Sequence, residues 1–172
     1  MESGKDEAVD NWPWGQYERL TGIEIAYEDD HLETEHIPLT RDYESRGPEA
    51  ISYRPSTGHW YVERRQETAS GDEICPTLVP RERVYVVIGY LRYSTLEAQR
   101  EFGDSEFERV RYDDGIEFRE LPNENEELLT PITFHPSTEH WQCVVRDLKN
   151  LENRQPIVTH RILPRESVVW VT

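Results

Sequence analysis

An internal repeat is the feature of this sequence that most constrains its fold. Residues 50–60 (AISYRPSTGHW) return as residues 131–141 (PITFHPSTEHW), and six of the eleven positions are identical. Some of the differences are conservative, such as Tyr53 against Phe134. A segment that recurs in this way is typical of a chain built from copies of one structural unit. The sequence therefore predicts an internal duplication.

Two flanking segments occur in the same order around the repeated block. Residues 22–25 (GIEI) precede the first block as residues 115–118 (GIEF) precede the second. Residues 78–84 (LVPRERV) follow the first block as residues 162–168 (ILPRESV) follow the second. Because three anchors share one order, we interpret them as parts of the same two copies.

These anchors divide the chain into four expected segments. An acidic and aromatic arm covers residues 1–21, a first β repeat covers 22–90, a connector covers 91–114, and a second β repeat covers 115–172. We attribute the greater length of the first repeat to an acidic insertion at residues 27–38.

The residues around each Pro-Ser-Thr segment predict a β-hairpin. In the first copy Ile51 and Tyr53 alternate with polar residues before the turn, and Trp60 and Val62 do so after it. Proline presets φ for a turn, and Ser and Thr hydroxyls bond nearby backbone groups. We therefore expect a four-residue connection between antiparallel strands in each copy.

Further strands are expected at residues 84–90 and 167–171, which are rich in β-branched and aromatic residues. In the connector, residues 94–97 (STLE) form a capping box that opens a short helix to about Phe102. The Asp-Gly step at residues 113–115 predicts another hairpin. The expected fold class is mainly β, with antiparallel hairpin units forming a sandwich or barrel and one short helix between the copies.

Residues 54–61 (RPSTGHWY) are similar to a segment of the FG-GAP and VCBS propeller repeats. The similarity covers eight residues, and the Asp-Gly-rich calcium loops of that family are absent beside it. Two copies cannot close a propeller, so neither the fold nor the ligand of that family is carried over.

The charge of the chain is strongly acidic, with 35 Asp and Glu against 19 Lys and Arg and a net charge of −16. Only two of the 19 cations are lysines. This balance resembles the proteins of salt-accumulating halophiles; the alternative is an ordinary acidic protein from a high-GC genome or its virus. Such a surface repels phosphates, so we expect no specific nucleic-acid binding.

The sequence predicts neither a membrane span nor an export signal, because it holds no long apolar run and its first residues are acidic. We therefore expect a protein that is cytoplasmic when made. We also expect that it needs no cofactor. No common catalytic motif occurs. The best candidate for a metal site lies in residues 29–36 (DDHLETEH), where strand spacing would put His31, Glu33 and Glu35 on one face; a metal-dependent enzyme would also use His36, and the alternative is a solvated acidic loop.

Two other groups of residues are candidates for interaction. His59-Trp60 and His140-Trp141 occupy equivalent places in the repeats, so they form either a paired ligand site or, more simply, inherited core anchors. Trp12, Trp14 and Tyr17 form an aromatic cluster in the acidic arm. That cluster either folds back onto its own core or anchors in a neighbour.

The function expected from the sequence is noncatalytic assembly through protein partners, by self-association or with neighbouring virion proteins. The specific hypothesis is a capsid-, neck- or tail-associated component of a virus with a halophilic host. The alternatives are a small-ligand or carbohydrate-binding β module that uses the His-Trp pairs, and a metal-dependent enzyme that uses the acidic His-Glu segment.

Overall fold

The computed structural model describes residues 20–28, 32–38, 50–91, 107–152 and 155–172. We call residues 20–91 the first half and residues 107–172 the second half. The strands are β1 (Leu20–Glu28), β2 (Leu32–Pro38), β3 (Ile51–Arg54), β4 (His59–Thr68), β5 (Gly71–Pro80), β6 (Val84–Leu91), β7 (Val110–Asp113), β8 (Phe118–Leu121), β9 (Glu126–Leu128), β10 (Thr133–His135), β11 (His140–Glu152), β12 (Gln155–Pro164) and β13 (Val168–Val171).

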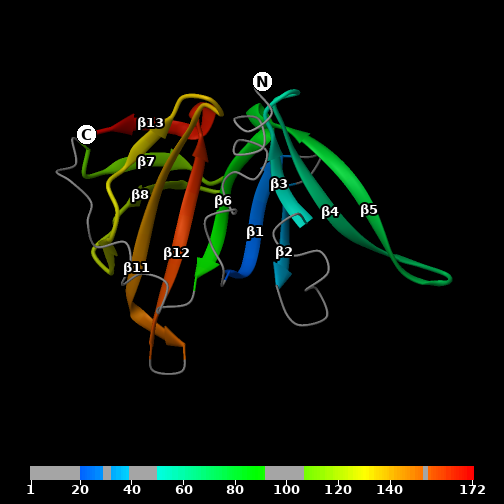
Figure 1. Cartoon of the computed structure of the whole chain (residues 1–172). Coiled ribbons are helices and arrows are strands. Elements are labelled where there is room, and N and C mark those ends of the chain that lie inside the picture. Colours follow the sequence, from blue (N-terminus) through cyan, green and yellow to red (C-terminus); the bar gives the residue numbers. More distant parts are fainter. Residues whose placement is uncertain (1–19, 29–31, 39–49, 92–106, 153–154) are drawn as a thin grey trace, which may run out of the picture.

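The strands form three antiparallel sheets (Figure 1). A seven-stranded sheet has the order β10-β11-β12-β6-β1-β2, with β9 beside β11. The two three-stranded sheets have the orders β3-β4-β5 and β13-β7-β8. The prediction of a mainly β, antiparallel fold is confirmed. The helix expected at residues 94–102 lies outside the described residues.

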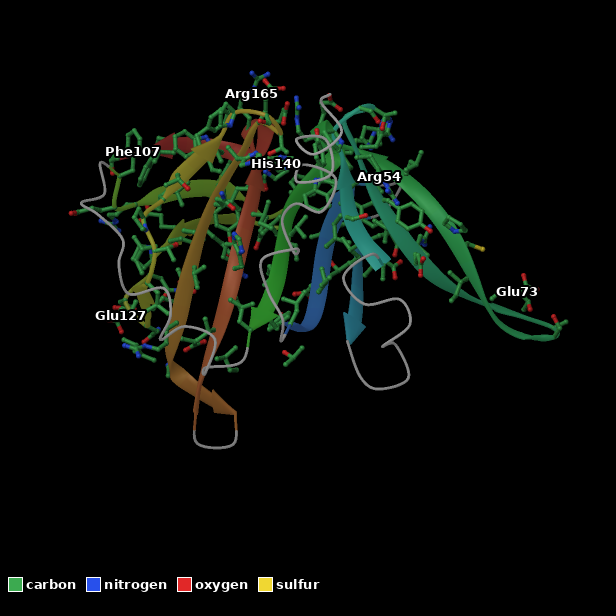
Figure 2. The ribbon with its side chains drawn as sticks, viewed as in Figure 1. Arg54, Glu73, Phe107, Glu127, His140 and Arg165 are labelled. Carbon is green, nitrogen blue, oxygen red and sulfur yellow. The ribbon has the colours of Figure 1, made fainter. Side chains whose placement is uncertain are left out.

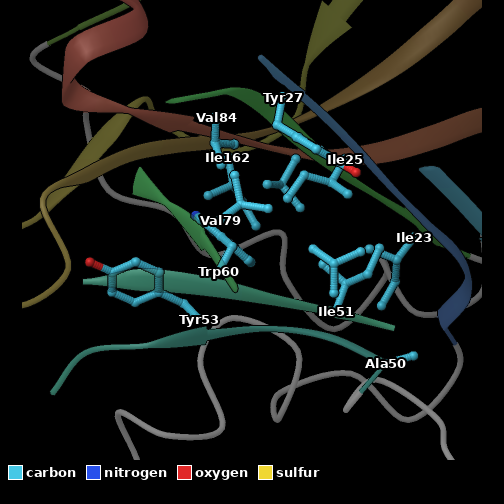
Figure 3. Close-up of a cluster of buried hydrophobic side chains, with 12 residues drawn as sticks. Ile23, Ile25, Tyr27, Ala50, Ile51, Tyr53, Trp60, Val79, Val84 and Ile162 are labelled. Carbon is cyan, nitrogen blue, oxygen red and sulfur yellow. The ribbon is translucent and has the colours of Figure 1, made fainter. Parts of the chain in front are cut away.

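The large sheet is the middle layer, because successive residues of its strands enter different cores. On β6, Val87 packs in one core and Val86 and Ile88 pack in the other, as alternation across a strand requires. The first core lies between β3-β4-β5 and the large sheet and contains Ile23, Ile25, Tyr27, Ala50, Ile51, Tyr53, Trp60, Val62, Val79, Val84, Val87 and Ile162 (Figure 3).

The second core lies on the opposite face of the large sheet, under β13-β7-β8. Its buried members are Ala26, Val86, Ile88, Val110, Tyr112, Leu121, Ile132, Cys143, Val145 and Leu163, and its partly buried members include Trp141, Val168 and Val171. Each half thus forms a sandwich, and each core also receives side chains from the other half.

The two Pro-Ser-Thr turns have the same backbone geometry. Each connects its strands through four residues, and the fourth has a positive φ, 71° at Gly58 and 60° at Glu139. The amide of Gly58 donates to Arg54 O at 2.9 Å, and the amide of Glu139 donates to His135 O at 2.8 Å. A short 3-10 helix follows β5 in the first half and β12 in the second, η4 (Arg81–Arg83) and η7 (Arg165–Ser167) respectively.

The order of elements after each turn is also the same. A long hairpin strand, a returning strand, a 3-10 helix and a final strand follow in both halves. The residues at matching positions fill the two cores in pairs: Ile51 and Ile132, Trp60 and Trp141, Val62 and Cys143, Val79 and Leu163, Val84 and Val168, and Val87 and Val171.

The match expected between residues 22–25 and 115–118 is wrong. Gly22 lies inside strand β1, whereas Gly115 lies in the turn between β7 and β8 with φ 93°. Strand β7 pairs with β13 as β1 pairs with β6: Tyr27 pairs with Val84 on β6, and Tyr112 pairs with Val168 on β13.

Within the segment 27–38, expected to be an insertion, residues 27–28 form the end of β1 and residues 32–38 form strand β2. This hairpin pairs with β6 through β1, as the hairpin of β7 and β8 pairs with β13 through β7. The segment therefore belongs to the sheet framework of its half. The sequence did not indicate strand β2, because the segment is acidic and the alternation of apolar residues ends within β1.

Strands β6 and β12 join the two halves. They pair antiparallel from Ile162–Val87 to Val158–Leu91 and so make one continuous sheet from strands of both halves. Because backbone hydrogen bonds cross this junction, the halves cannot separate without exposing two strand edges.

We predict that Gly115→Ala destabilises the protein more than Gly71→Ala. Both glycines have a positive φ, so each substitution introduces strain of about 1–2 kcal/mol. At Gly115, however, an added Cβ would lie 2.9 Å from the side chains of Leu32 and Tyr85, whereas nothing lies within 4 Å at Gly71. Overpacking should add about 1–3 kcal/mol at Gly115. Urea unfolding measures the free energy of unfolding of both variants. Equal losses would contradict the close approach of Leu32 and Tyr85 to Gly115.

Candidate functional site

The two Pro-Ser-Thr turns and the two 3-10 helices meet at one end of the molecule, where Figure 2 labels His140 and Arg165. Strand pairing explains the location. Each turn connects strands whose partner strand ends at the proline before η4 or η7, since His59 pairs with Pro80 and His140 with Pro164. We call this region the paired-turn site.

A cluster of three buried rings links the halves at this site. The indole Nε1 of Trp60 donates a hydrogen bond to Nε2 of His140 at 3.1 Å. The Tyr53 ring contacts both, with centroid distances of 4.8 Å to His140 and 5.4 Å to Trp60 in edge-on geometry. Figure 3 shows Tyr53 and Trp60 in the first core. A histidine of the second half therefore completes the core of the first.

This geometry fixes the protonation state of His140. An indole N–H can only donate, so Nε2 must carry a lone pair and the neutral ring must carry its proton on Nδ1. Burial lowers the pKa of His140 to about 3. The ring has no exposed surface. At neutral pH it can accept the indole hydrogen bond, but it offers solvent neither an acid nor a base.

An arginine at the start of η4 makes the polar connection between the halves. Arg81 is paired with Glu139 at 2.7 Å and with Glu166 at 2.7 Å, and its Nε adds bonds of 3.2 Å to both Glu166 oxygens. Its backbone amide donates to Gly58 O at 3.1 Å. One residue thus holds the first turn and two carboxylates of the second half.

The pKa shifts at the site follow from this arrangement. Burial raises the pKa of Tyr53, and a hydrogen bond with Arg81 partly opposes that effect. Burial also acts to raise the pKa of Glu166, but the bonds from Arg81 outweigh it and hold this pKa below its usual value. The pKa of Arg81 is raised, chiefly by its hydrogen bonds with Glu166. Arg81 and Glu166 are therefore both charged at neutral pH.

The residues predicted from the His-Trp repeats have different environments. Trp60 and His140 are buried and bonded to each other. Half-buried His59 makes a 2.8 Å bond between its Nδ1 and Thr57 O in its own turn. Trp141 is half-buried and packs against Phe134 with ring centroids 5.0 Å apart. The structure joins one histidine to the tryptophan of the other half rather than pairing the two histidines.

The other sequence candidates are only partly described. Trp12, Trp14, Tyr17 and His31 lie outside the described residues. Glu33 and Glu35 are half-buried on β2, and Glu35 is paired with Arg64 at 3.0 Å. A carboxylate that is already paired with an arginine is poorly suited to bind a metal ion. The described ranges contain no group of three or more His, Cys, Asp or Glu side chains placed to hold a metal.

Sequence reasoning missed the ionic part of this site. Arg81 and Glu166 lie in the Pro-Arg-Glu sequence that both flanking segments contain. That identity was the available signal, since identical charged residues next to identical prolines are unusual in loops of unconstrained sequence. What it could not indicate is that the arginine of one half would bind the glutamate of the other.

Comparison of the chain with protein-family models, curated proteins and solved structures finds no match. In the part of the chain that the structure describes, no helix has the length and apolarity needed to cross a membrane. The function must therefore be argued from the residues of the paired-turn site and from the surfaces around it.

We predict that Arg81→Gln costs more stability than Arg165→Gln, although the two arginines have matching positions. The Arg81 side chain is 12% exposed, and its loss would leave Glu166 without its nearest partner and Glu139 with Arg165 alone, at a cost of about 1–3 kcal/mol. Arg165 is 58% exposed, so its pair with Glu139 should contribute less than about 1 kcal/mol. Chemical denaturation checks this, and similar losses would contradict it.

We also predict that His140 and His160 make the fold sensitive to acid. Burial lowers the pKa of each to about 3, against an ordinary 6.5. Below pH 6.5 the unfolded chain takes up protons that the folded chain does not. Each histidine should therefore lower the free energy of unfolding by about 1.4 kcal/mol per pH unit as the pH falls towards 3.

The variant His140→Gln isolates this effect, because the amide oxygen of Gln can still accept the Trp60 hydrogen bond. Carboxylates titrate alike in the variant and the wild type, so the difference between their stability curves reports His140. We expect a shallower loss of stability in the variant between pH 7 and pH 5. Parallel curves would contradict a neutral, buried His140.

Proposed function

We propose that this protein is a noncatalytic assembly protein built from two copies of one β unit. The observation that carries the proposal is the use of the paired-turn residues. The most distinctive polar and aromatic side chains, those of Trp60, His140 and Arg81, are directed inward and join the two halves. Their chemistry is that of a connection rather than a reaction centre.

Several correspondences support the duplication. The turns share their hydrogen bonds and their positive φ, the order of elements is the same, and both final strands carry a bulge at matching positions, near Val84 in β6 and near Val168 in β13. We place the first copy from β1 to β6 and the second from β7 to β13, with β9 as an addition. This moves the start of the second copy from residue 115 to residue 110.

The alternatives have less support. A carbohydrate-binding module would present Trp60 and Trp141 as stacking surfaces, but Trp60 has no exposed surface and Trp141 is covered in part by Phe134. A metal-dependent enzyme would need Glu35 as a ligand, and that carboxylate is paired with Arg64. An assembly role makes no such demand on these residues.

The narrower hypothesis, a capsid-, neck- or tail-associated protein of a virus with a halophilic host, stays a prediction. It rests on the net charge of −16 and the near absence of lysine. Molar salt screens such a surface over about 3 Å, so copies of an acidic protein can approach one another there. In dilute buffer their repulsion opposes contact.

We expect the purified full chain to self-associate in molar KCl, with larger species at higher protein concentration and fewer in dilute buffer. Sedimentation velocity over a range of protein concentrations measures this directly. Electron microscopy of the same samples would then distinguish closed particles from extended ones. A monomer at every concentration and salt level would contradict the assembly role.

A further inference from the structure

We propose that a second copy of this chain docks head to tail, through a contact that repeats the junction between the two halves. The inference rests on the proposed assembly role and names its surfaces. One is the face and edge of β5 with η4, which we call the head. The other is the outer end of the second core, formed by β13 with η7, which we call the tail.

Each of the two strands that pair at the junction has a counterpart in the other half that lies at the edge of its sheet. Strand β12 pairs with β6, but its counterpart β5 is the last strand of its sheet. Strand β6 lies between β12 and β1, but its counterpart β13 has only β7 beside it among the described strands. Figure 1 shows β5 and β13 on opposite sides of the molecule. Within one chain these edges therefore cannot meet, whereas those of two copies can.

The head exposes apolar residues at the positions that the junction buries. On β12, Ile162 and Val158 have no exposed surface. Their counterparts on β5 are Leu78, which is 56% exposed, and Ile74, which is 37% exposed. Isolated exposed apolar residues are common, but these two repeat a pair that is fully buried in the other half.

The tail lacks an apolar side chain of the kind that the head exposes. In the first core, Ile162 arrives from the second half and packs with Trp60, Val84 and Val87, all of which are buried. In the second core, which receives Ala26, Val86 and Ile88 from the first half, no described residue takes the place of Ile162, and the counterparts Trp141, Val168 and Val171 are only partly buried. Leu78 of a second copy is the residue that would take the place of Ile162.

The charges follow the same pattern. Across the junction, Arg81 of the first half binds Glu166 of the second. The counterparts of these residues are Arg165 in the tail and Glu82 in the head, and both are exposed. A head-to-tail contact would bring this guanidinium and this carboxylate together as a pair of opposite charges.

The junction also supplies a register for the contact. It pairs Val87 with Ile162 and Ile88 with Arg161. The matching pairs between two copies are Val171 with Leu78 and Thr172 with Thr77. The β13 sheet of one copy would then continue into the β3-β4-β5 sheet of the next, as the first half continues into the second within the chain.

The first test compares Leu78→Glu with Leu148→Glu in the full chain in molar KCl. Both leucines are exposed to a similar extent, 56% and 53%, but Leu148 lies on β11 away from the head and the tail. We expect Leu78→Glu to raise the dissociation constant for self-association by about tenfold or more, and Leu148→Glu to leave it unchanged. Circular dichroism and thermal unfolding establish that both variants are folded.

The second test reverses the proposed ion pair. Glu82→Arg should weaken association, and so should Arg165→Glu, whereas the double variant should recover much of the loss because each contact again joins opposite charges. Mixing equal amounts of Leu78→Glu, which lacks a head, and Arg165→Glu, which has a weakened tail, should give mainly dimers through the one intact pair of surfaces.

The outcomes separate this inference from the function on which it rests. A wild-type chain that stays monomeric overturns both. If Leu78→Glu associates as strongly as the wild type, or if the double charge reversal does not recover association, the head-to-tail contact is overturned and the assembly role remains. Association lost in Leu78→Glu, kept in Leu148→Glu and recovered by the double reversal supports the contact.

Discussion

The antiparallel pairing of β6 with β12 is the interaction on which the rest of the structure depends. It removes one free edge from each half and makes a sheet with a core on both faces. Because the sheet is shared, Ile162 reaches the first core and His140 reaches Trp60. Without this pairing the first core would lose Ile162, which covers one side of it, and Arg81 would lose both of its carboxylate partners.

Local sequence predicted the local structure well. The Pro-Ser-Thr turns, the strands on either side of them and the final strand of each half lie close to where turn chemistry and alternating apolar residues indicate them. Sequence identity was a poorer guide where its context differed. The Gly-Ile-Glu match joined a strand interior to a turn, whereas the structural match of Ile25 and Tyr27 with Val110 and Tyr112 rests on one identical residue and a shared register with β6 and β13.

The candidate site could be located from the sequence but not assembled from it. The repeated His-Trp and Pro-Arg-Glu segments indicate which residues matter, since matching positions have matching backbones. Which copy of each residue is buried depends on contacts between the halves. His140 packs against Tyr53 and Trp60, whereas His59 bonds within its own turn, although each histidine follows a Pro-Ser-Thr turn and precedes a tryptophan.

The scarcity of lysine has a structural counterpart in the way this fold uses arginine. A guanidinium can bind two carboxylates and a hydroxyl in fixed directions, whereas an ammonium acts as a point charge. Arg81 uses that geometry to hold Glu139, Glu166 and Tyr53 at once, in a chain where acidic residues are in excess. In such a chain an arginine that binds two carboxylates connects segments and reduces their repulsion together. The proposed contact between two copies of the chain would face the same excess of negative charge. The exposed Arg165, on the tail side and next to Glu139, is placed to meet it in the same way.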